Sequence, residues 1–207
     1  MTDIGMVHGG TSYHLTTLAD PNLAPYRLRP VYLPELDPGQ LGALDTLIVC
    51  DRLHPGLLRE HAGTLLQVAG RGGTLVVLGE VEAHTWLPGA AWTARPANFW
   101  WWLSGEDPGI RRESPDHPIW AYLTPKHVTW HFHGLLDPPA GATALVTHEE
   151  DGQRTGVVLY EDTVSTPGRL VVTTLDPTYH HGSNFMPSAT RFLYGVLDWL
   201  TAPGAAA

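Results

Sequence analysis

Two stretches of the chain decide the fold: Leu75-Val76-Val77-Leu78-Gly79-Glu80 and Leu170-Val171-Val172-Thr173-Thr174-Leu175-Asp176. Each is an apolar run that ends in an acidic residue. Continuous apolar runs of this length are typical of strands buried on both faces, as in parallel sheets covered by helices. Ligands of open α/β sheets bind in the crevice beyond the carboxyl ends of the strands. We therefore expect a site near Glu80 and Asp176.

The composition favours one globular domain over residues 1–207, since 43% of the 207 residues are hydrophobic and only 16% are charged. A net charge of −9 with only 12 Lys and Arg argues against a nucleic-acid partner. The sequence has neither a secretory signal nor an apolar run of about 20 residues, so we expect no membrane partner. The lone Cys50 is compatible with a reducing compartment, and we expect a cytoplasmic protein.

A βαβ unit is predicted in the first half of the chain. Residues 44–50 form an apolar strand, and a helix with an apolar stripe runs from Pro55 to Gly70. Gly72 and Gly73 then turn the chain into a strand over 74–78. This order indicates a parallel sheet with crossover helices, a flavodoxin-like α/β sandwich with helices on both faces.

The remaining elements are predicted from the same patterns. A strong helical repeat covers residues 189–200, and Ser188 is placed as its N-cap. Pro30 argues for an edge position of the strand at 26–33. The other predicted elements are strands at 4–7, 128–133, 144–148, 156–160 and 170–175, a helix at 13–19 and a hairpin turn at 149–152.

A tryptophan-rich segment, residues 84–125, interrupts the regular pattern and is expected to be an insertion or cap. It contains Trp100-Trp101-Trp102, which cannot all be buried on one face. Aromatic side chains with polar edges suit a subunit interface or the stacking of a sugar. We expect a homodimer through this segment, with ligand stacking as the alternative.

Several segments together resemble the class I glutamine amidotransferase-like superfamily, and within it the trehalose-utilisation (ThuA-like) branch. They are LDTLIVCD (44–51), GGTLVVLG (72–79), DHPI (116–119), GRLVVTTL (168–175) and LDWL (197–200). The resemblance implies the flavodoxin-like fold already expected.

The chain departs from that superfamily at its catalytic residues. A working amidotransferase has a cysteine elbow after the strand that ends here at Gly79, and this chain has Glu80 instead. The superfamily's His-x-Glu element after the last strand is also missing. Without a nucleophilic thiol we expect no glutaminase activity.

Glu80 is the first catalytic candidate, because burial at a strand end would raise the pKa of its carboxyl group and suit it to proton transfer. The alternative is a carboxylate that caps a helix or anchors a loop. His131 and His133 share one face of their predicted strand, and we expect them, with His180, to relay protons or to contact substrate hydroxyls. The alternative is a polar strand surface.

Five further residues are candidates for substrate binding. His8 precedes Gly9-Gly10, which either cradles an anion or makes a tight turn. Asp176 either lines the crevice or caps a helix. The candidates are His8, His14, Trp86, Asp176 and His181.

Three hypotheses of function follow. The first is an enzyme-like pocket for a small polar, carbohydrate-derived molecule, with no cofactor. The second is a non-catalytic module for ligand binding or assembly on the same fold. The third is a metal-dependent hydrolase with ligands from His131 and His133 and a third from His180 or His181; the sequence commits no residue to a metal.

Overall fold

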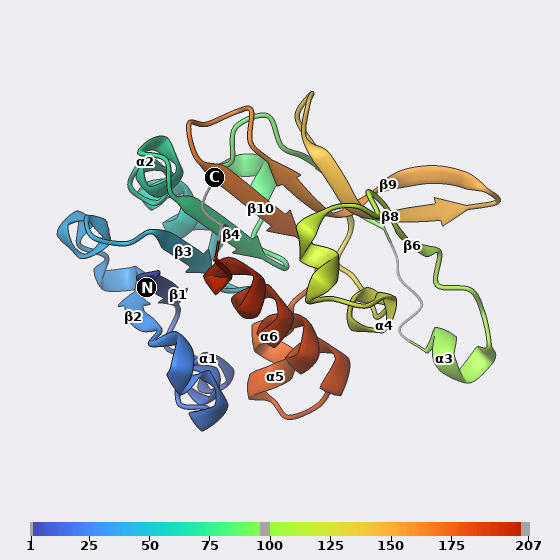
Figure 1. The fold of residues 1–207 in the computed structure, drawn as a ribbon, viewed down its shortest axis with the longest axis horizontal. Coiled ribbons are helices and arrows are strands. Elements are labelled where there is room, and N and C mark those ends of the chain that lie inside the picture. The colour runs from blue at the N-terminus through green and yellow to red at the C-terminus, as the bar shows by residue number, and fades with distance from the viewer. Residues whose placement is uncertain (1, 96–99, 204–207) are drawn as a thin grey trace.

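The structure is a computed structural model that describes residues 2–95 and 100–203, apart from the side chain of Trp102. Helices and strands alternate through the first half of the chain, and most later strands lie in antiparallel pairs (Figure 1). Among the described residues, no helix combines the length and apolar character that a membrane crossing requires.

Five parallel strands form the part of the sheet that positions the site. In spatial order they are β2 (Arg29–Tyr32), β1 (Ile4–His8), β3 (Thr46–Val49), β4 (Thr74–Leu78) and β10 (Arg169–Thr173). Their parallel register brings the carboxyl ends of β3, β4 and β10 to the same edge. The predicted strand over 74–78 matches β4.

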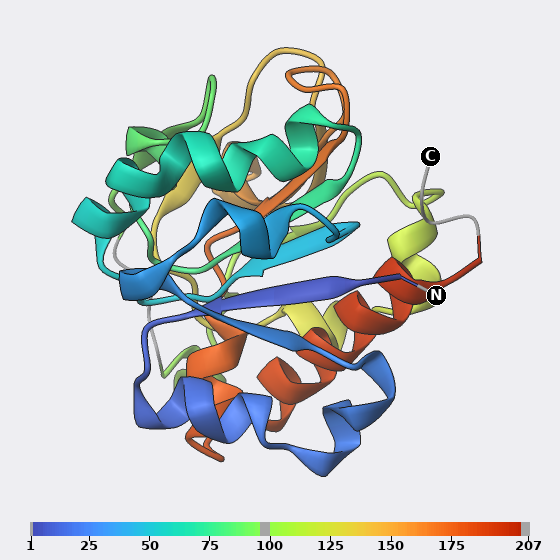
Figure 2. The same ribbon diagram turned by 90° about the vertical axis from the view of Figure 1, so that its left-hand side faces the viewer.

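Helices cover both faces of this sheet (Figure 2). The helix α2 (Pro55–Gly70) lies on one face, and α1 (Ser12–Leu18), α5 (Pro177–Gly182) and α6 (Pro187–Thr201) lie on the other. The buried side of α6 carries the apolar residues whose spacing predicted it, among them Phe192 and Leu197. The molecule is therefore the α/β sandwich that the sequence predicts.

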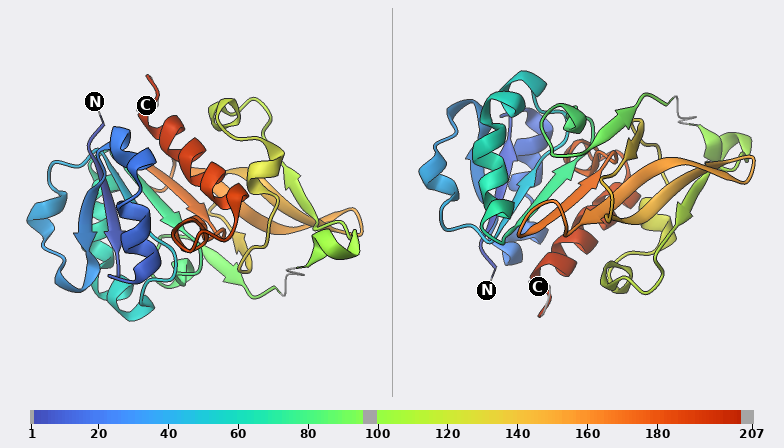
Figure 3. Two further views of the ribbon diagram at one scale, coloured as in Figure 1. Left: turned by 90° about the horizontal axis from the view of Figure 1, so that it is seen from below. Right: turned by 90° about the horizontal axis from the view of Figure 1, so that it is seen from above.

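An antiparallel extension continues the sheet beyond β10 and projects from the helix-covered half (Figure 3). It consists of β9 (Gln153–Asp162), β8 (Thr143–Glu150), β7 (Leu135–Asp137), β6 (Ile110–Arg112) and β5 (Ala91–Thr93). The tryptophan-rich segment supplies β5 and β6.

Short helices connect these elements. They are α3 (Trp101–Ser104), α4 (Pro125–Val128), and the 3-10 turns Pro21–Tyr26, Leu33–Glu35, Pro38–Leu41, Ala83–Thr85 and Pro118–Ala121.

Two local predictions are wrong. Residues 128–133 do not form a strand, because Pro125 starts the short helix α4, which takes up Val128, and the following residues run in irregular backbone. The N-cap of α6 is Met186 rather than Ser188, since Pro187 already occupies the first turn, where its missing N–H costs nothing.

Gly79 ends β4 at the tightest point of the crevice. Its φ is +65°, and a Cβ atom built there would lie 2.4 Å from the Cβ of Asp51 and 3.0 Å from that of Asp176. Only a residue without a side chain fits both this backbone conformation and this space.

We predict that Gly79→Ala lowers the free energy of unfolding by about 2–4 kcal/mol, because the added methyl group meets two buried neighbours at positive φ. Urea denaturation measures the change. Gly63→Ala is the matched control: it lies within α2 with no atom within 4 Å of its added Cβ, and should stabilise the protein by about 0.5–1 kcal/mol. Equal stability of the two variants would contradict the prediction.

Candidate functional site

The carboxylate of Asp176 is the centre of the candidate site. It follows β10, is fully buried, and accepts hydrogen bonds at Oδ2 from Arg52 Nη2 at 2.7 Å and Nε at 3.0 Å. Burial alone would raise the pKa of Asp176, but His133 and His180 outweigh burial and hold the pKa well below its usual value. Asp176 is therefore a buried anion within a group of cationic and imidazole side chains.

Two histidines face the other oxygen of this carboxylate. His180 Nε2 lies 3.2 Å and His131 Nε2 lies 3.7 Å from Asp176 Oδ1, and the two Nε2 atoms are 2.7 Å apart. Burial lowers the pKa of His131 to about 4, although Asp176 opposes the shift. Since His180 stands on α5 and His131 in the loop after α4, residues far apart in sequence form this pair.

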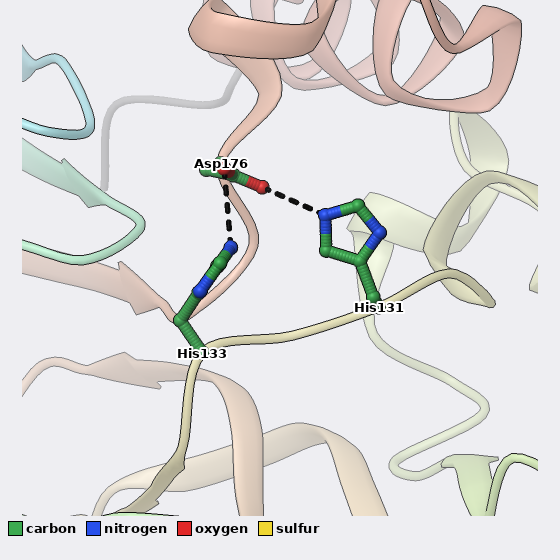
Figure 4. A group of neighbouring side chains, drawn as sticks. All are labelled: His131, His133 and Asp176. Atoms are coloured by element: carbon green, nitrogen blue, oxygen red, sulfur yellow. Dashed lines mark ion pairs between the residues drawn. The ribbon is translucent and has the colours of Figure 1, made fainter. Parts of the chain in front are cut away.

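His133 occupies the opposite side of Asp176 from His131 (Figure 4). Its Nε2 lies 3.2 Å from Asp176 Oδ2, and its Nδ1 lies 3.5 Å from Glu80 Oε2. Burial would lower the pKa of His133, but Asp176 and Glu80 outweigh it and raise the pKa. The imidazole thus stands between a buried carboxylate and a carboxylate at the surface.

Glu80 is in the predicted place but not in the predicted environment. Its side chain is 56% exposed, so the burial that made it the first catalytic candidate is absent. The reason is that the chain turns outward after Gly79, and the residue next to the buried wall is Asp176. Glu80 stays near the site only through His133.

A cavity of about 610 Å³ opens at the ends of β3, β4 and β10. Its wall includes Arg52, Glu80, Thr174 and Trp92. Trp86, predicted for this wall, is not among the lining residues: it is buried and donates a hydrogen bond from Nε1 to the carbonyl of Val81. The aromatic wall is Trp92, whose indole stacks on the ring of His84 at 5.6 Å.

A second cavity, of about 800 Å³, reaches the same group of side chains from the other side. It is lined mainly by apolar and aromatic residues, including Trp100, Trp101, Trp130 and Phe185, and His131 is part of its wall. The tryptophan run therefore contributes two side chains to a cavity, and the side chain of Trp102 lies outside the described residues.

His14 and His8 stabilise the turn after β1 rather than opening into the crevice. The ring of His14 is buried, its Nε2 donates to the carbonyl of Asp51 at 2.9 Å, and its Nδ1 accepts from the amide of Gly9 and the hydroxyl of Thr11. His8 Nδ1 accepts from the amide of Gly10. Because these amides are already bonded, the segment is the tight turn rather than an anion cradle.

His181 is also separate from the Asp176 group. It pairs with Asp20 through Nε2 at 3.1 Å and with the hydroxyl of Thr190 through Nδ1 at 3.0 Å. Adjacent residues of a helix point in different directions, so only one histidine of the 180–181 pair reaches Asp176.

Two neighbours of the site carry more of its structure than the sequence indicated. Asp51 accepts the amide and hydroxyl protons of Thr178 at 2.7 and 2.6 Å and the amide of Tyr179 at 3.1 Å. Burial, and then the charge of Asp176, raise the pKa of Asp51 to about 7. Asp51 thus caps α5, whereas the side chain of Asp176 makes no cap bond, against the capping alternative.

Arg52 was not a sequence candidate. It has a φ of +54°, and its guanidinium lies 3.9 Å from the centre of the Tyr179 ring. A basic residue next to a strand-end aspartate was the available signal, but its partner lies 124 positions further along the chain.

The described residues offer one set of donor atoms for a metal ion. Single donor atoms of His131, His133 and Asp176 lie within 4.8 Å of one another. Imidazole nitrogen with a carboxylate oxygen is a donor set typical of zinc and other divalent transition metals.

Comparison with known proteins identifies the fold and nothing finer. No family model and no curated protein matches the chain. The cytoplasmic protein STM1381 of Salmonella typhimurium LT2 is 13% identical with a TM-score of 0.59, over 95% of this chain and 98% of that one. The cytoplasmic protein STM3548 of Salmonella typhimurium is 11% identical with a TM-score of 0.57, over 96% and 98%.

A GMP synthase-like protein from Thermoplasma acidophilum also shares the fold. It is 12% identical with a TM-score of 0.53, over 95% of this chain and 92% of that chain. At these identities the likeness shows a common architecture, so the chemistry must be argued from the residues of this chain.

We predict that His14 makes stability depend on pH. Burial lowers its pKa to about 4 in the folded protein, from 6.5 ordinarily, so between these values the unfolded chain binds a proton that the folded protein does not. Stability therefore falls as the pH drops from about 6.5 to about 4, by about 3 kcal/mol for this group.

Urea midpoints at pH 7 and pH 5 test this effect in the wild type and in His14→Gln. The variant should lose less stability between the two pH values, since the other histidines are unchanged. His61→Gln, in α2, is the control and should follow the wild type. An unchanged pH response in His14→Gln would contradict the assignment.

Proposed function

We propose that the crevice at the ends of β3, β4 and β10 is an enzyme site for a small polar molecule, with His133 as its acid or base. One observation carries the proposal: the buried carboxylate of Asp176 binds Arg52 and His133 through one oxygen and faces His131 and His180 with the other. A buried anion surrounded in this way at the carboxyl edge of a sheet is typical of a functional site.

The geometry around His133 supports its role in proton transfer. Asp176 fixes one ring nitrogen, as a buried carboxylate does for the imidazole of a catalytic pair. The other nitrogen lies 3.5 Å from Glu80, which lines the 610 Å³ cavity. A proton therefore passes from a substrate in this cavity to His133 directly or through Glu80.

The cavity wall suggests the class of substrate. Arg52, Glu80 and Thr174 supply hydrogen-bonding groups, and Trp92 supplies a flat apolar surface. Molecules with hydroxyl groups on one side and an apolar ring face on the other, such as sugar derivatives, match this combination. The resemblance to the ThuA-like branch of the amidotransferase-like superfamily supports the same class.

Glutaminase chemistry is not part of the proposal. No cysteine follows β4, and Cys50, the one cysteine of the chain, is fully buried. Burial raises the pKa of its thiol well above the ordinary value, which disfavours the nucleophilic thiolate.

A non-catalytic binding module is the second candidate, and the exposure of Glu80 favours it. An exposed carboxylate has the ordinary solvation of a surface group and recognises ligands as well as it transfers protons. The two candidates differ in what they expect of His133: a binding module needs its contacts, and an enzyme needs its proton.

We predict that His133→Gln reduces kcat by about 100-fold or more, because glutamine keeps a polar contact to Asp176 but does not transfer a proton. The assay is a panel of p-nitrophenyl glycosides, esters and sugar lactones with the purified wild-type protein. His61→Gln is the control and should keep the wild-type rate.

The panel also separates the two candidates. Turnover that His133→Gln leaves unchanged would contradict the assignment of His133. Thermal stabilisation of the wild type by a sugar of the panel without any turnover would favour the binding module.

A further inference from the structure

The geometry points to a divalent metal site formed by His131 Nε2, His180 Nε2 and Asp176 Oδ1. Zn²⁺ is the ion that fits these donors best, since two imidazole nitrogens and a carboxylate oxygen are a known zinc ligand set. The inference is independent of the proposed function, because the ion would bind whether or not the crevice is catalytic.

The spacing of the three donor atoms fits one ion at their centre. Ligands of a tetrahedral ion at bond lengths of about 2.0–2.1 Å are about 3.3 Å from one another. The three distances here are 2.7 Å between the histidine nitrogens, and 3.2 and 3.7 Å from those nitrogens to Asp176 Oδ1. Their mean of about 3.2 Å needs only small side-chain shifts to become a regular set.

The same atoms are poorly satisfied as a purely hydrogen-bonded group. One proton at most lies between the two Nε2 atoms, so one of them presents a lone pair to the other. Asp176 Oδ1 is fully buried and, among the described residues, has no hydrogen-bond partner. A buried charged oxygen without a donor is costly, and a cation shared with both nitrogens would remove that cost.

Arg52 and His133 explain why the ion is placed at Oδ1 rather than Oδ2. Both lie against Oδ2, and the guanidinium makes two hydrogen bonds there. A positive group on the outer oxygen orients the carboxylate and leaves its other oxygen for the metal, as neighbouring groups commonly do around metal ligands. We therefore place His133 outside the ligand set, although its donor atom is within 4.8 Å of those of His131 and Asp176.

The fourth position of the ion would face the larger cavity. His131 is part of the wall of the 800 Å³ cavity, together with Trp130. A metal with three protein ligands and an open position keeps water or an exchangeable ligand there. The tryptophan-lined cavity would then deliver small molecules to the ion.

Titration with Co²⁺ tests the site without any assay of activity. The protein is expressed without a histidine tag, and the absorption bands of tetrahedral Co²⁺ report binding and geometry. We expect one ion per chain, displaced by one equivalent of Zn²⁺, and a higher melting temperature with Zn²⁺.

Two adjacent histidines supply a matched pair of variants. His180→Gln should weaken Co²⁺ binding by at least about 100-fold, and His181→Gln by less than about threefold, because only His180 faces Asp176. His133→Gln should weaken binding by about tenfold or less, as a neighbour of the ligands. Circular dichroism verifies that each variant is folded.

Three results would overturn the inference. They are the absence of tetrahedral Co²⁺ bands in the folded wild type, binding that His180→Gln leaves intact, and loss of binding in His181→Gln equal to that in His180→Gln. Loss in His133→Gln but not in His180→Gln would show that the other three-residue set is the site, and would also overturn this one.

Discussion

The rest of the site depends on compensation of one buried charge. Asp176 carries its negative charge in a place without solvent access, and such a charge is stable only when cations and hydrogen-bond donors surround it. Arg52 and His133 meet one oxygen, and His180 lies 3.2 Å from the other. These groups come from the end of β3, an irregular loop and α5. The requirement of one carboxylate thus holds three separate segments together at the edge of the sheet.

A second carboxylate places the helix that carries His180. Asp51 takes the first free amides of α5, and the small Gly79 allows Asp51 and Asp176 to approach each other across β4. Two acids this close favour one charge over two, which agrees with a raised pKa for Asp51 and a lowered one for Asp176. The acids therefore divide the work: Asp51 fixes backbone, and Asp176 holds side chains.

The sequence predicts the parallel half of the fold because each of its elements has a local signal. Apolar runs mark the strands around β4, and helical spacing marks α2 and α6. It predicts that His131, His133, His180 and Asp176 belong to one site, though the strand assumed for the first two is a loop. The role of Arg52 escapes local reasoning, since its left-handed backbone and its partner 124 residues away are products of the tertiary structure. The exposure of Glu80 is likewise decided by a turn, and the confinement of His14 by a backbone carbonyl.

The outer strand β2 has a consequence for how molecules meet one another. It is four residues long, ends the parallel side of the sheet, and carries Pro30 next to the exposed Arg29 and Tyr32. Proline has no amide hydrogen to offer, and a short edge with a charged residue is a poor template for a further strand. Open sheets otherwise invite intermolecular strand addition and fibril growth. The composition of this edge therefore protects a concentrated solution of the protein from aggregation along the sheet.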